Sequence, residues 1–340
     1  CTEHAPKWNP MNVCSYHLQE AGATPTQEIA YSMATAIDVL DAVRASGQVS
    51  DDQFSQVFGS ISFFVNAGIR FIEETCKLRA MTDMREQIGS ERYGVTDAKA
   101  LRFRYGVQVN SLGLTEAQPE NNVQRIVLEM LAVTLSKKAR ARSVQLPAWN
   151  EALGLPRPWD QQWSLRMQQI LAFETDLLEY DDLFEGNPAV ERKVAALKKG
   201  AMAELGQIDS MGDIQEKIEY MKSRLVESNA TRIAGIESGA TTVIGVNKFQ
   251  NGEPSPLTAG DDAIMVSDPA AEADQLARLA TWKADRDADA VSAALAALKA
   301  AALSDTNIMI PSIAAAKAGV TTGEWAQVIR NAFGQYRGPT

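Results

Sequence analysis

A tyrosine and a histidine stand side by side at a position where α/β proteins bind ligands. The β-rich segment of residues 11–16 ends at Tyr16, and His17 follows it directly. Ligands bind at the carboxyl ends of strands in parallel barrels and in open α/β sheets. A neutral imidazole there can donate a hydrogen bond to a carbonyl oxygen on which charge develops, and a phenol can bind the same group. Position alone fits a structural histidine equally well.

Polar residues also follow two later β-rich segments. Gln108 and Asn110 stand at the end of residues 103–109, and Glu151 comes after residues 143–146. If these segments are neighbouring parallel strands, their polar side chains converge on the rim that carries His17. Helix capping and loop hydrogen bonding explain such residues as well, and for Glu151 taken alone they are the better explanation.

Several other chemistries are excluded by the residues present. With only two histidines, His4 and His17, the chain has no histidine-based triad and no multi-histidine metal site. No glycine-rich nucleotide loop is found. The basic run of residues 137–142 can meet a phosphorylated ligand, but a solvated helix end explains it better. We interpret Trp149, Trp159 and Trp163 as core or docking residues.

Composition narrows the class of protein. The 340 residues, 45% of them hydrophobic, are enough for one or two globular domains. A formal charge of −10 does not suit the phosphate backbone, so nucleic acid is excluded as a partner. Cys1, Cys14 and Cys76 have no zinc-site spacing, and we expect them reduced in a cytoplasmic protein. No apolar run is long enough to cross a membrane.

The chain alternates short β-rich segments with long amphipathic helices. We predict strands at residues 11–16, 60–65, 103–109 and 143–146, each followed by a helix. This order is typical of parallel strands joined by right-handed crossovers, and four βα units are present. Capping boxes begin helices at Thr24, Ser50 and Thr321. From residue 187 the chain is mainly helical, with one strand predicted at 242–246 and a solvent-facing helix at 284–303.

Three ordered motifs resemble those of one enzyme family. Residues 9–23, Asn-Pro-Met-Asn-Val-Cys-Ser-Tyr-His-Leu-Gln-Glu-Ala-Gly-Ala, are similar to the Tyr-His-Met-Gln-Glu-Ala-Gly-Ala signature of adenosylcobalamin-dependent acyl-CoA mutases. Residues 111–116 with 119–122 resemble their second block, and residues 150–156 their third. The resemblance extends over essentially the whole chain. Within the family, residues 106–111 and 144–150 most resemble the (2R)-ethylmalonyl-CoA mutases.

The resemblance implies the carboxyl-terminal half of a TIM-type (β/α) barrel at residues 1–186. Residues 187–340 would form a helical linker or dimerisation region. The implied reaction is a radical rearrangement of the carbon skeleton, in which (2R)-ethylmalonyl-CoA becomes (2S)-methylsuccinyl-CoA with adenosylcobalamin as cofactor. A homodimer is expected. Neither histidine lies in the Asp-x-His-x-x-Gly motif that ligates cobalt in the family, so the metal ligand is expected outside this chain.

The resemblance also assigns roles to individual residues. His17 would hydrogen-bond the thioester carbonyl, with Tyr16 lining the same pocket. The acyl-CoA would be contacted by Lys7, Asn9, Ser60, Ser62 and Phe64, and the adenosyl side of the cofactor by Gln108 and Glu151. Ser60 replaces an arginine that helps to hold the CoA in many relatives, and Pro147 replaces an asparagine near the adenosyl group of methylmalonyl-CoA mutases.

Four βα units are half of what a closed barrel needs. Because the chain begins at Cys1 and not at Met, we expect the fold to begin upstream. The missing half-barrel and the cobalamin domain would then be supplied in cis or in trans, and we expect no activity from the 340 residues alone. Methylmalonyl-CoA mutase-type activity, or a non-catalytic subunit that completes a barrel in trans, are the alternatives. The sequence does not support a hydrolase, because it offers no set of nucleophile, base and orienting group.

Overall fold

A parallel sheet of four strands organises the first part of the chain. The computed structural model describes residues 5–258 and 263–335, so Cys1 and His4 lie outside the described residues. The sheet has the order β1-β2-β3-β4, with strands at Asn12–Cys14, Ser62–Ala67, Tyr105–Val109 and Ser143–Gln145. All three pairings are parallel, which confirms the four predicted βα units.

The sheet has two open edges among the described residues. Each of the outer strands, β1 and β4, pairs with a single neighbour. A closed (β/α) barrel has eight strands and no edges. Four parallel strands with consecutive order and two edges are what one half of such a barrel provides.

Helices connect the strands and continue the chain after them. In chain order, the α-helices of the described residues are α1 Tyr16–Glu20, α2 Pro25–Ala45, α3 Asp51–Ser60, α4 Phe71–Glu91, α5 Ala98–Leu101, α6 Asn121–Thr134, α7 Pro158–Phe173, α8 Pro188–Asp209, α9 Ile214–Glu237, α10 Pro269–Asp285, α11 Ala288–Ala302, α12 Met309–Lys317 and α13 Thr322–Phe333. None of these described helices is long and apolar enough to span a membrane.

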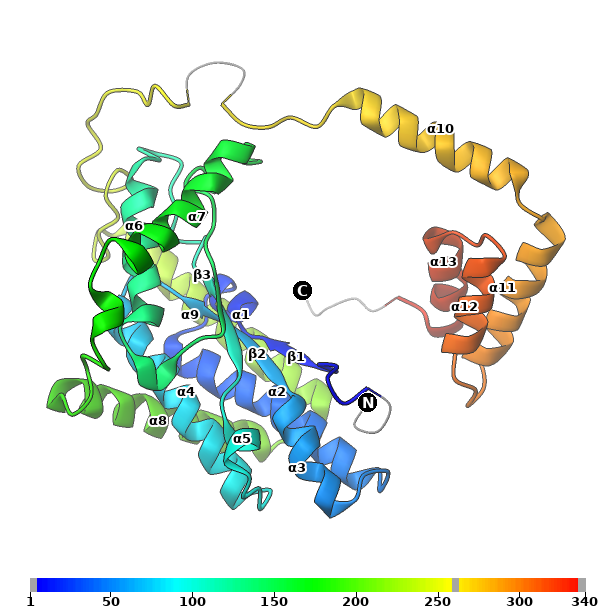
Figure 1. The fold of residues 1–340 in the computed structure, drawn as a ribbon, viewed down its shortest axis with the longest axis horizontal. Coiled ribbons are helices and arrows are strands. Elements are labelled where there is room, and N and C mark those ends of the chain that lie inside the picture. Colours follow the sequence, from blue (N-terminus) through cyan, green and yellow to red (C-terminus); the bar gives the residue numbers. More distant parts are fainter. Residues whose placement is uncertain (1–4, 259–262, 336–340) are drawn as a thin grey trace. The chain divides into compact units, whose positions relative to one another are not determined.

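One face of the sheet is covered by helices. Alternate strand residues on this face are apolar and buried, among them Phe63, Val65 and Val107. They share one core cluster with residues of α2, α4 and α8, such as Ile29 and Leu78. Figure 1 shows α2 and α4 beside the strands, and α8 packs against these two helices. On the opposite face, the residues of the edge strands β1 and β4 are exposed or partly exposed, whereas most residues of β2 and β3 are buried there as well.

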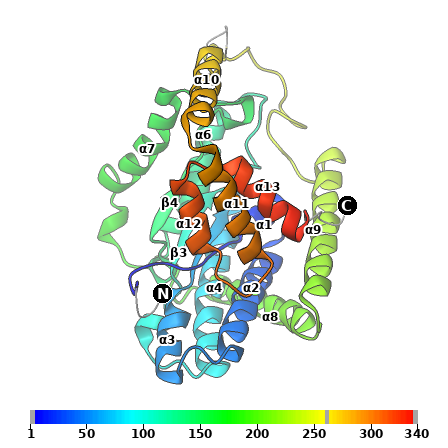
Figure 2. The ribbon, with the colours of Figure 1, turned by 90° about the vertical axis from the view of Figure 1, so that its right-hand side faces the viewer.

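The chain divides into two compact units. Unit 1 extends to Met265 and unit 2 from Val266 onward. In unit 1, α8 packs against α2 and α4, and α9 lies beside them, with Lys217 Nζ 2.6 Å from Asp38 Oδ1 (Figure 2). The helical region predicted from residue 187 therefore begins in unit 1. In unit 2, α11 contacts both α12 and α13.

Three predicted elements differ from the structure. The first strand ends at Cys14, because the chain turns at Ser15 into α1, so Tyr16 and His17 lie on a helix. The strand predicted at 242–246 is wrong: this segment is a turn with an isolated bridge between Ile244 and Lys248. The helix predicted at 284–303 is interrupted after residue 285, where Asp287 caps α11.

The three predicted capping boxes are confirmed. At Thr24, Ser50 and Thr321 the hydroxyl accepts from the third helical amide, and the third side chain accepts from the cap amide. For Thr24 the partner is Gln27, with amide-to-oxygen distances of 3.3 and 2.8 Å. These bonds satisfy amides that a helix would otherwise leave without partners. They fix where α2 begins, directly after the segment that carries His17.

Thr24→Ala is expected to lower the free energy of unfolding of unit 1 by about 1 kcal/mol, because it removes the cap of a long buried helix. Urea denaturation followed by circular dichroism measures this loss. Thr35→Ala, at an exposed position in the middle of the same helix, is the matched control. An equal effect of the two substitutions would contradict the capping role.

Candidate functional site

The face of the sheet opposite the helices carries polar and small side chains. The strand register places on this face Asn12, Cys14, Ser62, Phe64, Asn66, Gly106, Gln108, Ser143 and Gln145. We call this set the open face. Its residues on the two edge strands are exposed. A polar surface of this kind suits a long polar ligand lying along the strands, and the apolar face behind it supplies the rigid support.

An aromatic cluster lies at the carboxyl end of the open face. The ring of Tyr16 meets Phe64 edge-on, with centroids 5.2 Å apart, and lies 3.8 Å from the imidazole of His17. A glycine at position 106 is required here, because a Cβ would approach the Phe64 ring to 2.9 Å and the Ser143 hydroxyl to 2.6 Å. Gly106 therefore allows Phe64 to lie across β3, where it supports Tyr16.

The two ring nitrogens of His17 have different surroundings. Its Nδ1 lies 3.7 Å from Glu20 Oε2, and its side chain is 62% exposed. Within the described part of the chain, Nε2 has no hydrogen-bond partner. Burial raises the pKa of the Tyr16 phenol, and Glu20 and Cys14 add to the effect, so the phenol stays neutral. His17 Nε2 and the Tyr16 hydroxyl can both donate hydrogen bonds to a ligand carbonyl.

Of the predicted CoA-contacting residues, Asn9, Ser60 and Ser62 lie near the amino end of β2, whereas Phe64 belongs to the aromatic cluster. The Asn9 amide oxygen accepts from the Ser62 hydroxyl at 2.5 Å, and its nitrogen donates to the carbonyls of Ser60 and Met11. Asn12 also donates to Ser62, at 3.0 Å. The Ser60 hydroxyl donates to a carbonyl of its own helix, α3, and Lys7 is exposed. The structure thus brings Asn9 and Ser62 together.

A second polar group lies at the rim, beside α1. The Ser111 hydroxyl donates to Glu20 at 3.3 Å, and Glu151 lies close to the same serine. Burial raises the pKa of Glu151, although the nearby Ser111 hydroxyl opposes the shift. Gln108 is buried on the open face, and its amide donates to the Val109 carbonyl at 3.3 Å. Glu20 and Ser111 were not predicted as site residues, because they carry no signal beyond membership in the motifs.

A buried ion cluster lies behind this rim. Lys77 is fully buried and contacts two carboxylates, Glu28 at 2.6 Å and Glu74 more closely still. Burial by itself lowers the pKa of Lys77, but the two carboxylates outweigh it and raise the pKa above the usual value. Lys77 therefore stays charged in the protein interior. Lys77 was not predicted as a site residue, although a lysine between the apolar residues Cys76 and Leu78 of a buried helix is the available signal.

Two motif residues have structural roles. Gly22 has a positive φ of 103°, and a Cβ there would come within 2.4 Å of the Asn229 side chain, so this glycine lets α9 approach. Asn122 is fully buried. Its side-chain oxygen accepts from the Thr115 amide, and its side-chain nitrogen donates to the carbonyls of Thr115 and Trp149. It joins the loops after β3 and β4. Trp149 is also fully buried, as a core role requires.

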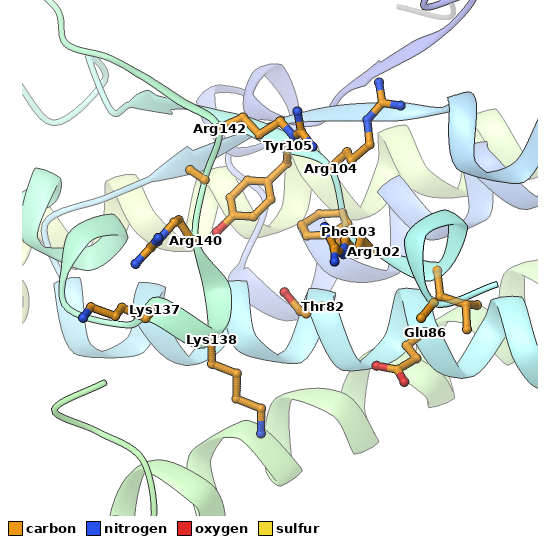
Figure 3. A pocket seen from close by; sticks show the side chains of 13 residues that line it. Thr82, Glu86, Arg102, Phe103, Arg104, Tyr105, Lys137, Lys138, Arg140 and Arg142 are labelled. Atoms are coloured by element: carbon orange, nitrogen blue, oxygen red, sulfur yellow. The ribbon is translucent and has the colours of Figure 1, made fainter. Parts of the chain in front are cut away.

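A basic pocket of about 720 Å³ lies at the opposite, amino end of β3 and β4. Its charged lining residues are Glu86, Arg102, Arg104, Lys137, Lys138, Arg140 and Arg142. In Figure 3 Lys138 points past α4, whereas the ends of Arg104 and Arg142 point away from it. Lys137 pairs with Asp181 at 3.1 Å. The cations surround the pocket without converging on one point, which makes it a positive surface and not a closed anion site.

Metal ligands are not grouped in the described ranges. No cluster of three or more histidine, cysteine or acidic side chains is placed to hold a metal ion among residues 5–258 and 263–335. Cys14 is exposed and Cys76 is buried, and both are free thiols. The site therefore offers hydrogen-bond donors, carboxylates and aromatic surface.

Comparison with known proteins shows the family. The sequence profile described as methylmalonyl-CoA mutase matches residues 1–335. The chain is 68% identical to ethylmalonyl-CoA mutase of Cereibacter sphaeroides over 337 residues, which is 99% of the chain and 51% of that protein. It is 63% identical to ethylmalonyl-CoA mutase of Methylorubrum extorquens, over 100% of the chain and 50% of that protein.

A more distant relative is named for a different activity. Methylmalonyl-CoA mutase of Cereibacter sphaeroides is 31% identical, over 99% of the chain and 46% of that protein. The chain spans about half the length of the curated relatives it matches. The match over nearly all of its own residues shows that the chain belongs to the methylmalonyl-CoA mutase family.

Proposed function

We propose that this chain forms half of the acyl-CoA-binding barrel of an ethylmalonyl-CoA mutase. The observation that carries the proposal is the Tyr16, His17 and Phe64 cluster at the carboxyl end of the open face. It offers two hydrogen-bond donors on an aromatic support, which a thioester carbonyl requires. Identities of 68% and 63% to ethylmalonyl-CoA mutases, against 31% to a methylmalonyl-CoA mutase, support ethylmalonyl-CoA as the substrate.

The open face gives the substrate a direction. With the thioester at His17, the pantetheine chain would run along β2 and β3 past Phe64 towards Ser62 and Asn9. The phosphates of CoA would then lie at the amino ends of the strands, where Arg104 and Arg142 point away from α4. Lys7 and Ser60 would line the same end. Ser60 stands where many relatives carry an arginine. Arg104 lies close to this position, because its guanidinium donates to the Gly59 carbonyl at 2.9 Å.

The rim fits the adenosyl side of adenosylcobalamin. Glu151, Ser111 and Glu20 are acceptors and donors of the kind that ribose hydroxyls bind, and the pKa of Glu151 is raised by burial. Gln108 would face the same region. The cofactor supplies a carbon-centred radical when bound, and the chain's own residues would orient the carbonyl and exclude water. The cobalt ligand is assigned to a segment outside this chain. A homodimer and a cytoplasmic location stay predictions.

The test is a competition between two substrates. The chain is combined with the amino-terminal half-barrel and the cobalamin domain of a relative, and ethylmalonyl-CoA and methylmalonyl-CoA are supplied at equal concentration with adenosylcobalamin. We expect methylsuccinyl-CoA to exceed succinyl-CoA at least about tenfold, as a substrate pocket that differs by one methylene allows. Excess succinyl-CoA would assign methylmalonyl-CoA mutase activity instead. Absence of both products would favour a non-catalytic subunit.

A further inference from the structure

The helix that carries Tyr16 and His17 has little apolar attachment to the protein. α1 spans five residues, none of which is fully buried, and its cap residue Ser15 makes no capping bond. Leu18 alone of this helix packs partly against the core cluster. A helix this short is not stable by itself. Polar contacts therefore add to the contacts of Leu18 and Tyr16 in fixing its position.

Besides the bond from Ser111 to Glu20, two hydrogen bonds join α1 to buried carboxylates, one at each end of the helix. At the start, the buried Ser15 hydroxyl donates to Glu28 Oε1 at 2.9 Å. At the end, the Gln19 amide donates to Glu74 Oε1 at 3.3 Å. The two acceptors belong to different helices, α2 and α4. Lys77 joins them, since its ammonium contacts both Glu28 and Glu74.

The same cluster extends the sheet beyond its last paired residues. The ladder between β1 and β2 ends at Cys14 and Phe64. Past that point, Glu28 Oε1 also accepts from the Asn66 amide at 3.0 Å, and Lys77 donates to the Asn66 carbonyl at 2.8 Å. One carboxylate and one ammonium thus hold the ends of both strands together where the backbone no longer does.

We propose that Lys77, acting through Glu28 and Glu74, is a positioning residue that holds α1 so that His17 faces the thioester. The cluster makes this attachment without contacting the substrate. The cluster of Lys77, Glu28 and Glu74 is rigid, because each carboxylate contacts both the ammonium and a neutral hydrogen-bond donor. The inference rests on the proposed function for the role of His17, but the attachment of α1 itself can be tested without any activity.

The first test uses hydrogen exchange on the 340-residue chain. Ser15→Ala and Gln19→Ala, combined in one protein, remove both bonds to the buried carboxylates and leave the contacts of Lys77 with Glu28 and Glu74 in place. We expect amides within and just after α1, such as those of Leu18, Ala21 and Gly22, to exchange at least about tenfold faster. Ser32→Ala is the matched control, because Ser32 is a buried serine on α2 that bonds only its own helix. Unchanged exchange at α1 would overturn the proposal.

The second test measures coupling to His17 in the completed mutase. The double variant is expected to lower kcat by about 10-fold to 100-fold with little change in KM, since a small displacement of a reacting group is costly. In a His17→Ala background the same substitutions should change kcat by less than about twofold. An equal loss in both backgrounds would indicate a purely structural role and overturn the proposal.

The two tests separate failure of this inference from failure of the proposed function. A completed wild-type assembly without mutase turnover would contradict the proposed function, and the exchange result would then decide the inference alone. Lys77→Met is a harsher variant that leaves two buried carboxylates without a cation. If Lys77→Met does not fold, the Ser15 and Gln19 variants still give the answer, because they remove neutral donors only.

Discussion

His17→Ala is expected to lower mutase turnover in the completed assembly by about one to three orders of magnitude. The imidazole has a free Nε2 at the carboxyl end of the open face and stands 3.8 Å from the Tyr16 ring. Removing it takes away the donor that would stabilise charge on the thioester carbonyl during rearrangement. The effect should fall on kcat, because the bond strengthens as charge develops. Steady-state kinetics with ethylmalonyl-CoA measure it.

Two comparisons make the His17 result specific. Tyr16→Phe keeps the ring packing on Phe64 and removes only the hydroxyl, so we expect a smaller loss than for His17→Ala. The unfolding midpoint of His17→Ala should match that of the wild type, because the side chain is 62% exposed. A wild-type rate for His17→Ala would make this residue a structural histidine.

Glu129→Gln is expected to stabilise unit 1, and increasingly so as the pH rises. Glu129 is 1% exposed, and neither carboxylate oxygen has a hydrogen-bond partner in the described structure. Burial, with a contribution from Glu74, raises its pKa from 4.5 to about 9. Between these values the folded chain keeps a proton that the unfolded chain loses, so stability falls by about 1.4 kcal/mol per pH unit.

A glutamine side chain does not ionise, so the free energy of unfolding of the Glu129→Gln variant should lack this dependence on pH. The gain from Glu129→Gln is therefore absent below about pH 4.5 and reaches about 3 kcal/mol at pH 7. Urea denaturation at pH 4, 5.5, 7 and 8.5 measures it, with the exposed Glu116→Gln as the control for loss of one negative charge. A gain that does not grow between pH 5.5 and 8.5 would show that Glu129 is ionised in the folded protein.

Local signals predicted the fold well where they act over a few residues. The capping boxes at Thr24, Ser50 and Thr321 lie within four residues of chain and were all correct. The strand predicted at 242–246 was wrong because β-branched residues favour a strand only if another strand is available to pair with. The break after residue 285 was missed because Asp287, a capping residue, lies in a strongly helical Ala-rich context.

The site was predictable in its motifs but not in its supports. Tyr16 and His17 were found from their place after the first strand, although the strand ends earlier and a helix carries them. Lys77 was missed because its partner Glu28 is 49 residues away, and a helical pattern alone does not show which charged side chain points inward. Asn122 and Gly22 belong to the recognised motifs, and their packing roles emerged only from tertiary contacts.

The most direct test of the account is turnover by complementation. Ethylmalonyl-CoA and adenosylcobalamin are incubated with the 340-residue chain alone, with the amino-terminal half-barrel and cobalamin domain of a relative alone, and with all parts together. Methylsuccinyl-CoA is measured by mass spectrometry. We expect product only when the parts are combined. Absence of methylsuccinyl-CoA from a folded, combined assembly, or its formation by the 340-residue chain alone, would contradict the account.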